Sequence, residues 1–295
     1  MLDVTGLRIH GLSKTYSNGV RALDGVTLEI GSGLFGLLGP NGAGKSTLMR
    51  TIAALQEPDG GENSLDGIDV RRTPHELRRR LGYLPQEFGV YPNISALALL
   101  DHIAVLKKLT NRAERTEQVH ALLQLTNLWE FRKKAVSTFS GGMKQRFGIA
   151  QALLGKPRLI IVDEPTAGLD PEERNRFHNL LSEIGQGAVV VLSTHIVEDV
   201  SDLCPKMAIL ARGRVLMKGE PSRVIESLRG RLWRKTIAKA ALPEYERAHK
   251  VISTRLFAGQ TQVNVLADSQ PESGFELVPP ELEDVYFSVL AGSAF

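Results

Sequence analysis

Residues 39–47 constrain the possible fold of this chain more than any other stretch. They read Gly-Pro-Asn-Gly-Ala-Gly-Lys-Ser-Thr and match the pattern GxxxxGK[ST] of a phosphate-binding loop. Residues 34–38 before the loop form a short apolar run of the buried-strand type, and apolar residues recur at helical spacing after it, at Leu48, Met49 and Ile52. The order strand, loop, helix favours polyphosphate binding over a glycine-rich turn that binds nothing.

The residues of this loop have separate expected roles. Gly39, Gly42 and Gly44 let the backbone turn with its N–H groups facing inward, and the following helix adds the positive end of its dipole. Lys45 is placed to reach the β- and γ-phosphates, and the Ser46 hydroxyl is the expected Mg²⁺ ligand. We assign the whole loop to phosphate binding: Gly39, Pro40, Asn41, Gly42, Ala43, Gly44, Lys45, Ser46 and Thr47.

Two later apolar runs also end in polar residues. Residues 159–162 are of the buried parallel-strand type and lead to Asp163 and Glu164, and residues 188–192 lead to His195. An isolated acid pair after a strand is more often a loop or helix cap, but a parallel sheet presents its ligands at the carboxyl ends of its strands. Asp163 is therefore expected to complete the Mg²⁺ shell, and Glu164 to act on water. The other six histidines lack such a setting, and we assign them to the surface or to packing.

An antiparallel hairpin is predicted near the N-terminus. Residues 4–13 and 22–30 alternate apolar and polar positions around the turn signal at 17–19. Tyr16 lies just before that turn. An aromatic side chain at a strand end usually packs in the core or at an edge, but a purine needs a flat apolar platform, so Tyr16 is also a candidate for stacking on the base.

Helical segments are predicted between the strands. Apolar residues recur at helical spacing between residues 94 and 131, which indicates two or more amphipathic helices. Residues 81–86 look like a strand that ends at Gln86. Residues 140–142, Ser-Gly-Gly, open a further helix, where free N–H groups and a hydroxyl predict a second anion-binding site. The arginines between 71 and 80 are expected to form a solvated helix face.

The composition limits the class of protein. A chain of 295 residues, 42% of them hydrophobic and 23% charged, has room for one large or two modest globular domains. A net charge of +3 suits a phosphorylated ligand or an anionic membrane surface and does not demand nucleic acid. Cys204 is the only cysteine, which favours a reducing cytoplasm. We expect no secretory signal, and residues 96–106 are too short to cross a bilayer.

The order of these motifs resembles the ATP-binding subunit of ABC (ATP-binding cassette) transporters over about residues 4–220. Six motifs occur in the family's order: the phosphate loop at Gly39 to Thr47, the glutamine loop at Gln86, the signature at Ser140-Gly-Gly-Met-Lys-Gln-Arg146, the acidic strand at Leu159 to Glu164, the Gly168-Leu-Asp170 loop and the switch histidine His195. The chain departs from the family's usual LSGGQ signature, because it has Phe139 in the first place and Met143 in the fifth.

The resemblance implies a head-to-tail pair of cassettes, with each ATP held by the phosphate loop of one and the segment 140–142 of the other. It also implies that His195 contacts the γ-phosphate, that Gln86 links Mg²⁺ and water to a transmembrane partner, and that Asp170 ties the two half-sites together. The predicted catalytic residues are Lys45, Gln86, Glu164 and His195. The predicted ATP-binding residues are Tyr16, the loop Gly39 to Thr47, Ser140, Gly141, Gly142 and Asp170. The predicted Mg²⁺ ligands are Ser46, Gln86 and Asp163.

The expected fold class is α/β: a P-loop NTPase (RecA-like) core with an antiparallel β subdomain and a helical insertion, plus a small C-terminal α+β domain. We expect the ATPase domain at 1–220, its helical insertion at about 88–157, and the C-terminal accessory domain at 221–295. The accessory domain is predicted to hold strands at 232–238, 251–257 and 261–267 and a closing helix from Pro279 to Leu290.

A tail of this kind is similar to those of cassettes from prokaryotic type-2 exporters. The expected function is therefore that of an ATPase, with ATP and Mg²⁺ as cofactors, which powers a separate integral membrane permease, in the direction of export. The expected partners are a second copy or a related cassette and the permease, with no nucleic acid. The expected location is the cytoplasm, peripheral on the inner face of the cell membrane.

Two other functions agree less well with the sequence. Soluble cassette proteins that act on nucleic acid or ribosomes usually carry two cassettes in one chain, or a very long coiled coil between phosphate loop and signature. This chain has one cassette and only residues 48–139 between the two motifs. A small-molecule kinase would leave the signature and His195 without a role.

Overall fold

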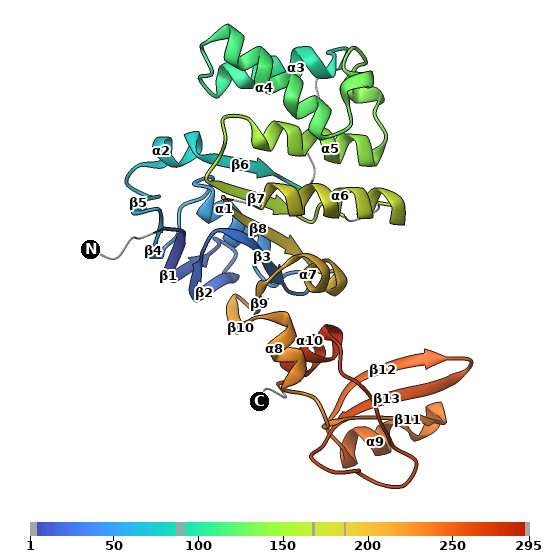
Figure 1. Cartoon of the computed structure of the whole chain (residues 1–295). Helices are drawn as coiled ribbons and strands as arrows, with labels where there is room; N and C mark the ends of the chain where they lie inside the picture. Colours follow the sequence, from blue (N-terminus) through green and yellow to red (C-terminus); the bar gives the residue numbers. More distant parts are fainter. Residues whose placement is uncertain (1–4, 87–88, 90–91, 167–168, 186, 293–295) are drawn as a thin grey trace.

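A computed structural model describes residues 5–292 except 87, 88, 90, 91, 167, 168 and 186. These described residues build three sheets (Figure 1). The first is antiparallel, with the order β2-β1-β4-β5, and consists of β1 (Leu7–Thr15), β2 (Arg21–Ile30), β4 (Gly60–Leu65) and β5 (Ile68–Asp69). Val26, Leu28 and Ile30 of β2 are buried while Thr27 and Glu29 are exposed. This alternation confirms the predicted hairpin.

The second sheet carries the predicted phosphate loop, acid pair and His195 at the carboxyl ends of its parallel strands. Its six strands, in the order β10-β9-β3-β8-β7-β6, are β3 (Gly33–Leu38), β6 (Leu81–Leu84), β7 (Leu159–Asp163), β8 (Val189–Thr194), β9 (Lys206–Ala211) and β10 (Arg214–Gly219). All neighbours are parallel except β9 and β10. The register sets Leu38 beside Thr194 and Asp163 beside Ser193, so the carboxyl ends of β3, β7 and β8 lie side by side.

The two faces of this sheet belong to different cores. Ile161 and Val191 lie in the core shared with the antiparallel sheet, α1 (Lys45–Ile52) and α2 (Pro74–Arg79). Ile160 and Val190 lie in the core shared with α6 (Pro171–Ile184) and α7 (Val197–Leu203). Because side chains alternate along a strand, one continuous apolar run supplies both cores.

The helical insertion has a core of its own, as Figure 1 shows at the top of the molecule. It contains α3 (Ala96–Leu106), α4 (Arg112–Leu125), α5 (Gly141–Leu153) and the short 3₁₀ helices η1 (Trp129–Phe131) and η2 (Val136–Thr138). Ser95, Asn111 and Ser140 cap α3, α4 and α5 by accepting hydrogen bonds from backbone N–H groups of their first turns. The predicted amphipathic helices between residues 94 and 131 are confirmed.

The C-terminal part forms the third sheet, with the antiparallel order β12-β13-β11-β14. Its elements are α8 (Pro221–Glu226), β11 (Leu232–Ile237), η3 (Lys239–Ala241), α9 (Leu242–Ala248), β12 (Val251–Phe257), β13 (Gln260–Leu266), β14 (Glu276–Leu277) and α10 (Leu282–Leu290). The three predicted strands are confirmed. Helix α10 starts at Leu282, later than the predicted Pro279, because Glu281 and Asp284 form a reciprocal capping box.

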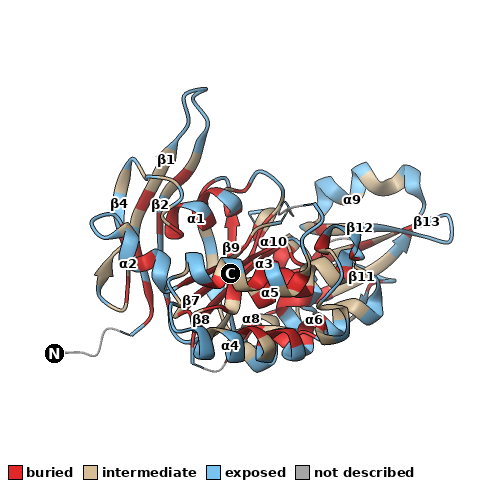
Figure 2. Cartoon of the chain, turned by 90° about the horizontal axis from the view of Figure 1, so that it is seen from above, coloured by how far each residue is buried: buried red, intermediate tan, exposed pale blue. Residues whose placement is uncertain are grey.

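Helix α10 brings the chain back to the part that carries the six-stranded sheet. It packs on α7 and α8, and its residues Leu282, Val285 and Val289 share a core with Val200 of α7. Strands β7 and β8 of the six-stranded sheet are buried along their whole length, whereas Figure 2 shows α9 and the tip of the β12–β13 hairpin largely exposed. Among the helices of the described residues, none has the length and apolar character needed to span a bilayer.

Candidate functional site

The predicted phosphate loop joins β3 to α1, and close backbone contacts explain its glycines. A Cβ atom on Gly39 would lie 2.3 Å from the carbonyl oxygen of Leu210, and one on Gly44 would lie 2.3 Å from that of Ala22. Gly42 and Gly44 also have φ angles of +77° and +104°. Gly44 caps α1 without a side-chain hydrogen bond, so the first N–H groups of the helix are available to an anion.

Lys45 lies enclosed by this loop, with an exposed fraction of 5%. Its Nζ atom donates to the carbonyl oxygens of Gly39 (2.6 Å) and Pro40 (3.3 Å) and lies 3.6 Å from Oε1 of Glu164. Burial lowers the pKa of Lys45, and the carboxylates of Glu164 and Asp163 oppose that shift. A charged phosphoryl oxygen is a stronger acceptor for this ammonium group than a neutral carbonyl.

The carboxylate of Glu164 is the meeting point of the predicted catalytic residues. Its Oε2 atom lies 3.2 Å from Nδ1 of His195 and accepts a hydrogen bond from Nε2 of Gln86 at 3.4 Å, while Lys45 lies on the Oε1 side. The φ angle of Glu164 is +48°, in the left-handed region, and its N–H donates to the carbonyl of Ser193 at 2.8 Å. Such a backbone is strained for a residue other than glycine and persists only where its surroundings hold it.

Asp163 fits the predicted role of a cation ligand. It is 5% exposed, and its Oδ1 atom has no hydrogen-bond partner in the described part of the chain. Burial raises the pKa of Asp163, and the nearby hydroxyls of Ser193 and Ser46 and the ammonium of Lys45 oppose the shift. A buried carboxylate oxygen that lacks a donor, beside a serine hydroxyl, suits a hard cation such as Mg²⁺.

Protein carboxylates alone would not hold that cation. Within the described residues, no group of three or more His, Cys, Asp or Glu side chains could bind a metal ion. Mg²⁺ is usually held by one or two protein ligands together with phosphate oxygens and water, and Ser46 and Asp163 match that pattern.

Tyr16 lies next to the phosphate loop. Its hydroxyl is 3.1 Å from Oγ1 of Thr47 and donates to Oε1 of Gln56 at 3.1 Å, and the side chain is 37% exposed. These two hydrogen bonds set the ring of Tyr16 beside the start of α1. The position agrees with a ring that stacks on a bound base, and stacking itself stays a prediction.

The remaining predicted residues lie at helix starts. Ser140 accepts a hydrogen bond from the N–H of Met143 at 3.2 Å, and Asp170 accepts one from the N–H of Glu173 at 2.9 Å. Ser140 and Gly141 are exposed, and no hydrogen bond of the described residues joins them or Gly142 to the phosphate loop. Gly168, which belongs to the predicted loop before Asp170, lies outside the described residues.

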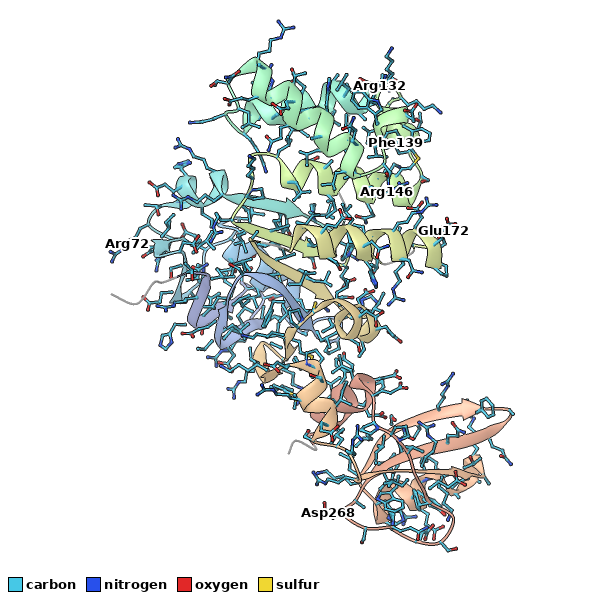
Figure 3. All side chains as sticks on the ribbon, in the orientation of Figure 1. Arg72, Arg132, Phe139, Arg146, Glu172 and Asp268 are labelled. Carbon is cyan, nitrogen blue, oxygen red and sulfur yellow. The ribbon has the colours of Figure 1, made fainter. Side chains whose placement is uncertain are left out.

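Helices α5 and α6 lie side by side where these starts occur, as the labelled residues Arg146 and Glu172 show in Figure 3. Nε of Arg146 lies 3.4 Å from Oε2 of Glu173 and links the two helices. A Cβ atom on Gly142 would lie 2.6 Å from the same carboxylate oxygen. Gly142 therefore serves the packing of α5 on α6 as well as the predicted anion site.

Two polar residues, the buried Asp199 and the half-buried Lys107, could not be found from the sequence. Asp199 is fully buried in α7, although an acid in the first turn of a helix ordinarily faces solvent. Lys107 follows α3, and its Nζ atom donates to the carbonyls of Leu81 (3.2 Å), Ala152 (3.3 Å) and Leu154 (3.0 Å). Burial lowers the pKa of Lys107 from 10.5 to about 8.

Comparison with known proteins identifies the family. The family described as "ABC transporter" matches residues 23–167. The daunorubicin/doxorubicin resistance ATP-binding protein DrrA of Streptomyces peucetius is 32% identical over 265 residues, which cover 88% of this chain and 77% of that protein. The chain belongs to the ATP-binding proteins of ABC transporters. The linearmycin resistance ATP-binding protein LnrL of Bacillus subtilis is 33% identical to this cassette, over 76% of the chain and 72% of that protein.

One similar protein is much longer than this cassette. The probable multidrug ABC transporter ATP-binding protein YbhF of Escherichia coli is 32% identical over 273 residues, which are 88% of this chain and 47% of YbhF. The cassette thus spans about half the length of that relative.

Solved structures confirm the predicted fold class of the cassette. An ATP-binding subunit of an ABC transporter is 32% identical, with a TM-score of 0.68, over 76% of this chain and 93% of that one. The bacterial cassette MJ0796, solved as a dimer, is 28% identical, with a TM-score of 0.66, over 72% of this chain and 98% of that one. MJ0796 is also known in a dimeric post-hydrolysis state bound to ADP and Pi.

Proposed function

We propose that this cassette hydrolyses ATP and thereby powers a separate membrane permease. The observation that carries the proposal is the arrangement around Glu164, where Lys45, Gln86 and His195 meet at the edge of the sheet that also holds the phosphate loop. These side chains provide a base, a cation for the phosphates and two polar groups that can orient water and phosphate in one place. A binding module that only held nucleotide would not need them together.

The residues then have the following roles. The N–H groups of residues 39–47 and the ammonium of Lys45 bind the phosphates, and Tyr16 stacks on the base. Glu164 accepts a hydrogen bond from the attacking water, and His195 contacts the γ-phosphate. Ser46, Asp163 and Gln86 hold Mg²⁺, which, when bound, neutralises charge on the β- and γ-phosphates.

A second copy completes the site in this proposal. Ser140 and Gly141 are exposed at the N-terminus of α5, where free N–H groups can bind a γ-phosphate held by another molecule. Two cassettes that meet head to tail would each supply one phosphate loop and one segment 140–142, with Asp170 near the junction. The dimeric structure of the similar cassette MJ0796 supports this assembly. ATP favours the closed pair only as far as it binds that pair more tightly than the separate copies.

The wider biological role is export by a permease at the inner face of the cell membrane. The support comes from the similar proteins DrrA and LnrL, both named for resistance to a compound. We further propose an ATPase domain at 1–220, with its helical insertion at about 88–157, and an accessory domain at 221–295 that α10 anchors to α7. No nucleic acid partner belongs to this proposal.

The decisive experiment compares wild-type cassette with Glu164→Gln and, as a control, Glu226→Gln on α8. We expect wild type and the control to hydrolyse ATP with Mg²⁺. Glu164→Gln should still bind ATP and form a dimer, as measured by light scattering, while its kcat falls about 10²- to 10⁴-fold. A Glu164→Gln protein that hydrolyses at the wild-type rate would remove Glu164 from its role. A wild-type protein that fails to hydrolyse ATP, alone and with its co-purified permease, would refute the function.

A further inference from the structure

A buried carboxylate joins three segments that surround the candidate site. Asp199 lies in the first turn of α7, with an exposed fraction of 0%. Its Oδ1 atom accepts a hydrogen bond from Nε of Arg174 at 2.8 Å and lies 2.8 Å from Nε2 of His178, both on α6. Its Oδ2 atom accepts hydrogen bonds from the hydroxyls of Thr166 and Thr194. All four partners come from outside α7.

The first link leads to Glu164. Thr166 is two residues beyond Glu164, whose φ angle of +48° needs support from its surroundings. The N–H of Glu164 is held by the carbonyl of Ser193, and the hydroxyl of Thr166 is held by Asp199. The segment 164–166, which contains the strained backbone of Glu164, is therefore held at two points, of which Asp199 provides one.

The second link leads to His195. The hydroxyl of Thr194 donates to Oδ2 of Asp199 at 3.3 Å and accepts a hydrogen bond from the N–H of Ile196 at 3.0 Å. Thr194 and Ile196 are the residues directly before and after His195. One hydroxyl thus fixes the backbone on both sides of the histidine that lies 3.2 Å from Glu164.

The third link leads to α6. Arg174 and His178 hold Asp199 from this helix, which begins directly after Asp170, and α6 and α7 pack on the same face of the sheet (Figure 1). A displacement of α6 would therefore pull on Asp199 and, through it, on the segments at 164–166 and 194–196. The carboxylate is buried with a cationic partner, so removing either charge would leave the other unpaired.

We propose that Asp199 is a positioning residue for ATP hydrolysis. It sets the spacing between the Glu164 and His195 segments and ties both to α6, without contact to the nucleotide. This inference rests on the function proposed above. Misplacement of reacting groups by about 1 Å can cost about 10²-fold in rate, so small movements at these hydrogen bonds have large effects on kcat.

The test uses two variants that preserve shape. Thr194→Val removes the hydroxyl between Asp199 and His195, and Asp199→Asn leaves only one carbonyl oxygen where two carboxylate oxygens serve four partners. We expect each to lower kcat about 10- to 100-fold while the KM for ATP changes little. Asp66→Asn is the matched control, because Asp66 also pairs with an arginine, Arg158 at 3.1 Å, but in the turn between β4 and β5.

A positioning role also predicts non-additivity. In a His195→Ala background, Thr194→Val should cause little further loss of kcat, since the hydroxyl acts through that histidine. Independent, multiplicative losses would overturn the inference.

Hydrogen exchange gives a readout that does not depend on activity. Asp199→Asn should speed amide exchange at Glu164, at Thr166 and at residues 194–196, and leave β9 and β10 unchanged. If wild type hydrolyses ATP but the variants keep its kcat, the inference fails and the proposed function stands. If wild type does not hydrolyse ATP, the proposed function fails, and the inference, which rests on it, fails with it. Unchanged exchange rates at these segments in Asp199→Asn would overturn the inference and leave the proposed function intact.

Discussion

Nδ1 of His195 lies 3.2 Å from Oε2 of Glu164, although the two residues are 31 positions apart in the sequence. The contact exists because β7 and β8 are parallel neighbours whose register sets Asp163 beside Ser193. Both residues follow the ends of their strands and so meet at one edge of the sheet. The imidazole is 45% exposed, and the carboxylate only 13%. The histidine is therefore the member of the pair that a second molecule or a nucleotide can reach.

The first prediction concerns this pair. We expect His195→Ala to lower kcat for ATP hydrolysis about 10²-fold, because Glu164 loses a polar neighbour and the γ-phosphate loses a predicted contact. The KM for ATP should change little, since the phosphate loop provides most of the binding. Steady-state ATPase assays measure both constants. His249→Ala, in the C-terminal part, is the control and should retain the wild-type kcat; a variant at 195 with full activity would exclude the role.

The second prediction concerns the packing of β3 on α7. A Cβ atom on Gly36 would lie 2.6 Å from Cγ1 and 2.8 Å from Cγ2 of Val200. Gly36→Ala should therefore lower the free energy of unfolding by about 1–3 kcal/mol through overpacking. In the double variant Gly36→Ala/Val200→Ala the new methyl group occupies the space of the old ones, so the two losses should be less than additive. Denaturant unfolding tests this; simple addition of the losses would contradict the close contact.

The sequence predicted the strands and motifs that depend on local pattern. The loop at 39–47 and the apolar runs before Asp163 and His195 carry periodicity and turn chemistry that need no tertiary information, and parallel topology then brings their ends together. The buried role of Asp199 could not be predicted, since Glu198 and Asp202 on the same helix look alike in sequence. Helices α8 and α9 were also missed, because six or seven residues are too few to establish a helical period.

The third prediction separates two roles of Tyr16. If its ring stacks on the base, Tyr16→Ala should raise the KM for ATP about 10-fold, within the range of about 1–3 kcal/mol for stacking, while Tyr16→Phe should stay near wild type. If the hydroxyl matters mainly through its hydrogen bonds to Thr47 and Gln56, both variants should raise KM equally. Titration with a fluorescent ATP analogue, alongside the ATPase assay, distinguishes the two results. Equal effects of the two variants would exclude stacking as the main contribution.

The fourth prediction concerns Lys107 and the stability of the helical insertion at alkaline pH. Burial lowers the pKa of Lys107 from 10.5 to about 8 in the folded chain. Between these two values the unfolded chain binds more protons than the folded chain, so the contribution of this lysine to stability rises with pH. Below pH 8 both states are protonated, and the burial cost of the charge is present in full.

Lys107→Met should therefore remove the pH-dependent contribution of this lysine to the free energy of unfolding. The difference in unfolding free energy between wild type and Lys107→Met should change by at most about 2 kcal/mol between pH 8 and 9.5, in favour of wild type as pH rises. Urea unfolding at four or five pH values measures it. Lys108→Met, at the exposed neighbouring position, is the matched control, and its difference from wild type in unfolding free energy should not change with pH. A flat difference for Lys107→Met as well would mean that the three carbonyls of Leu81, Ala152 and Leu154 stabilise the ammonium form enough to cancel the effect of burial.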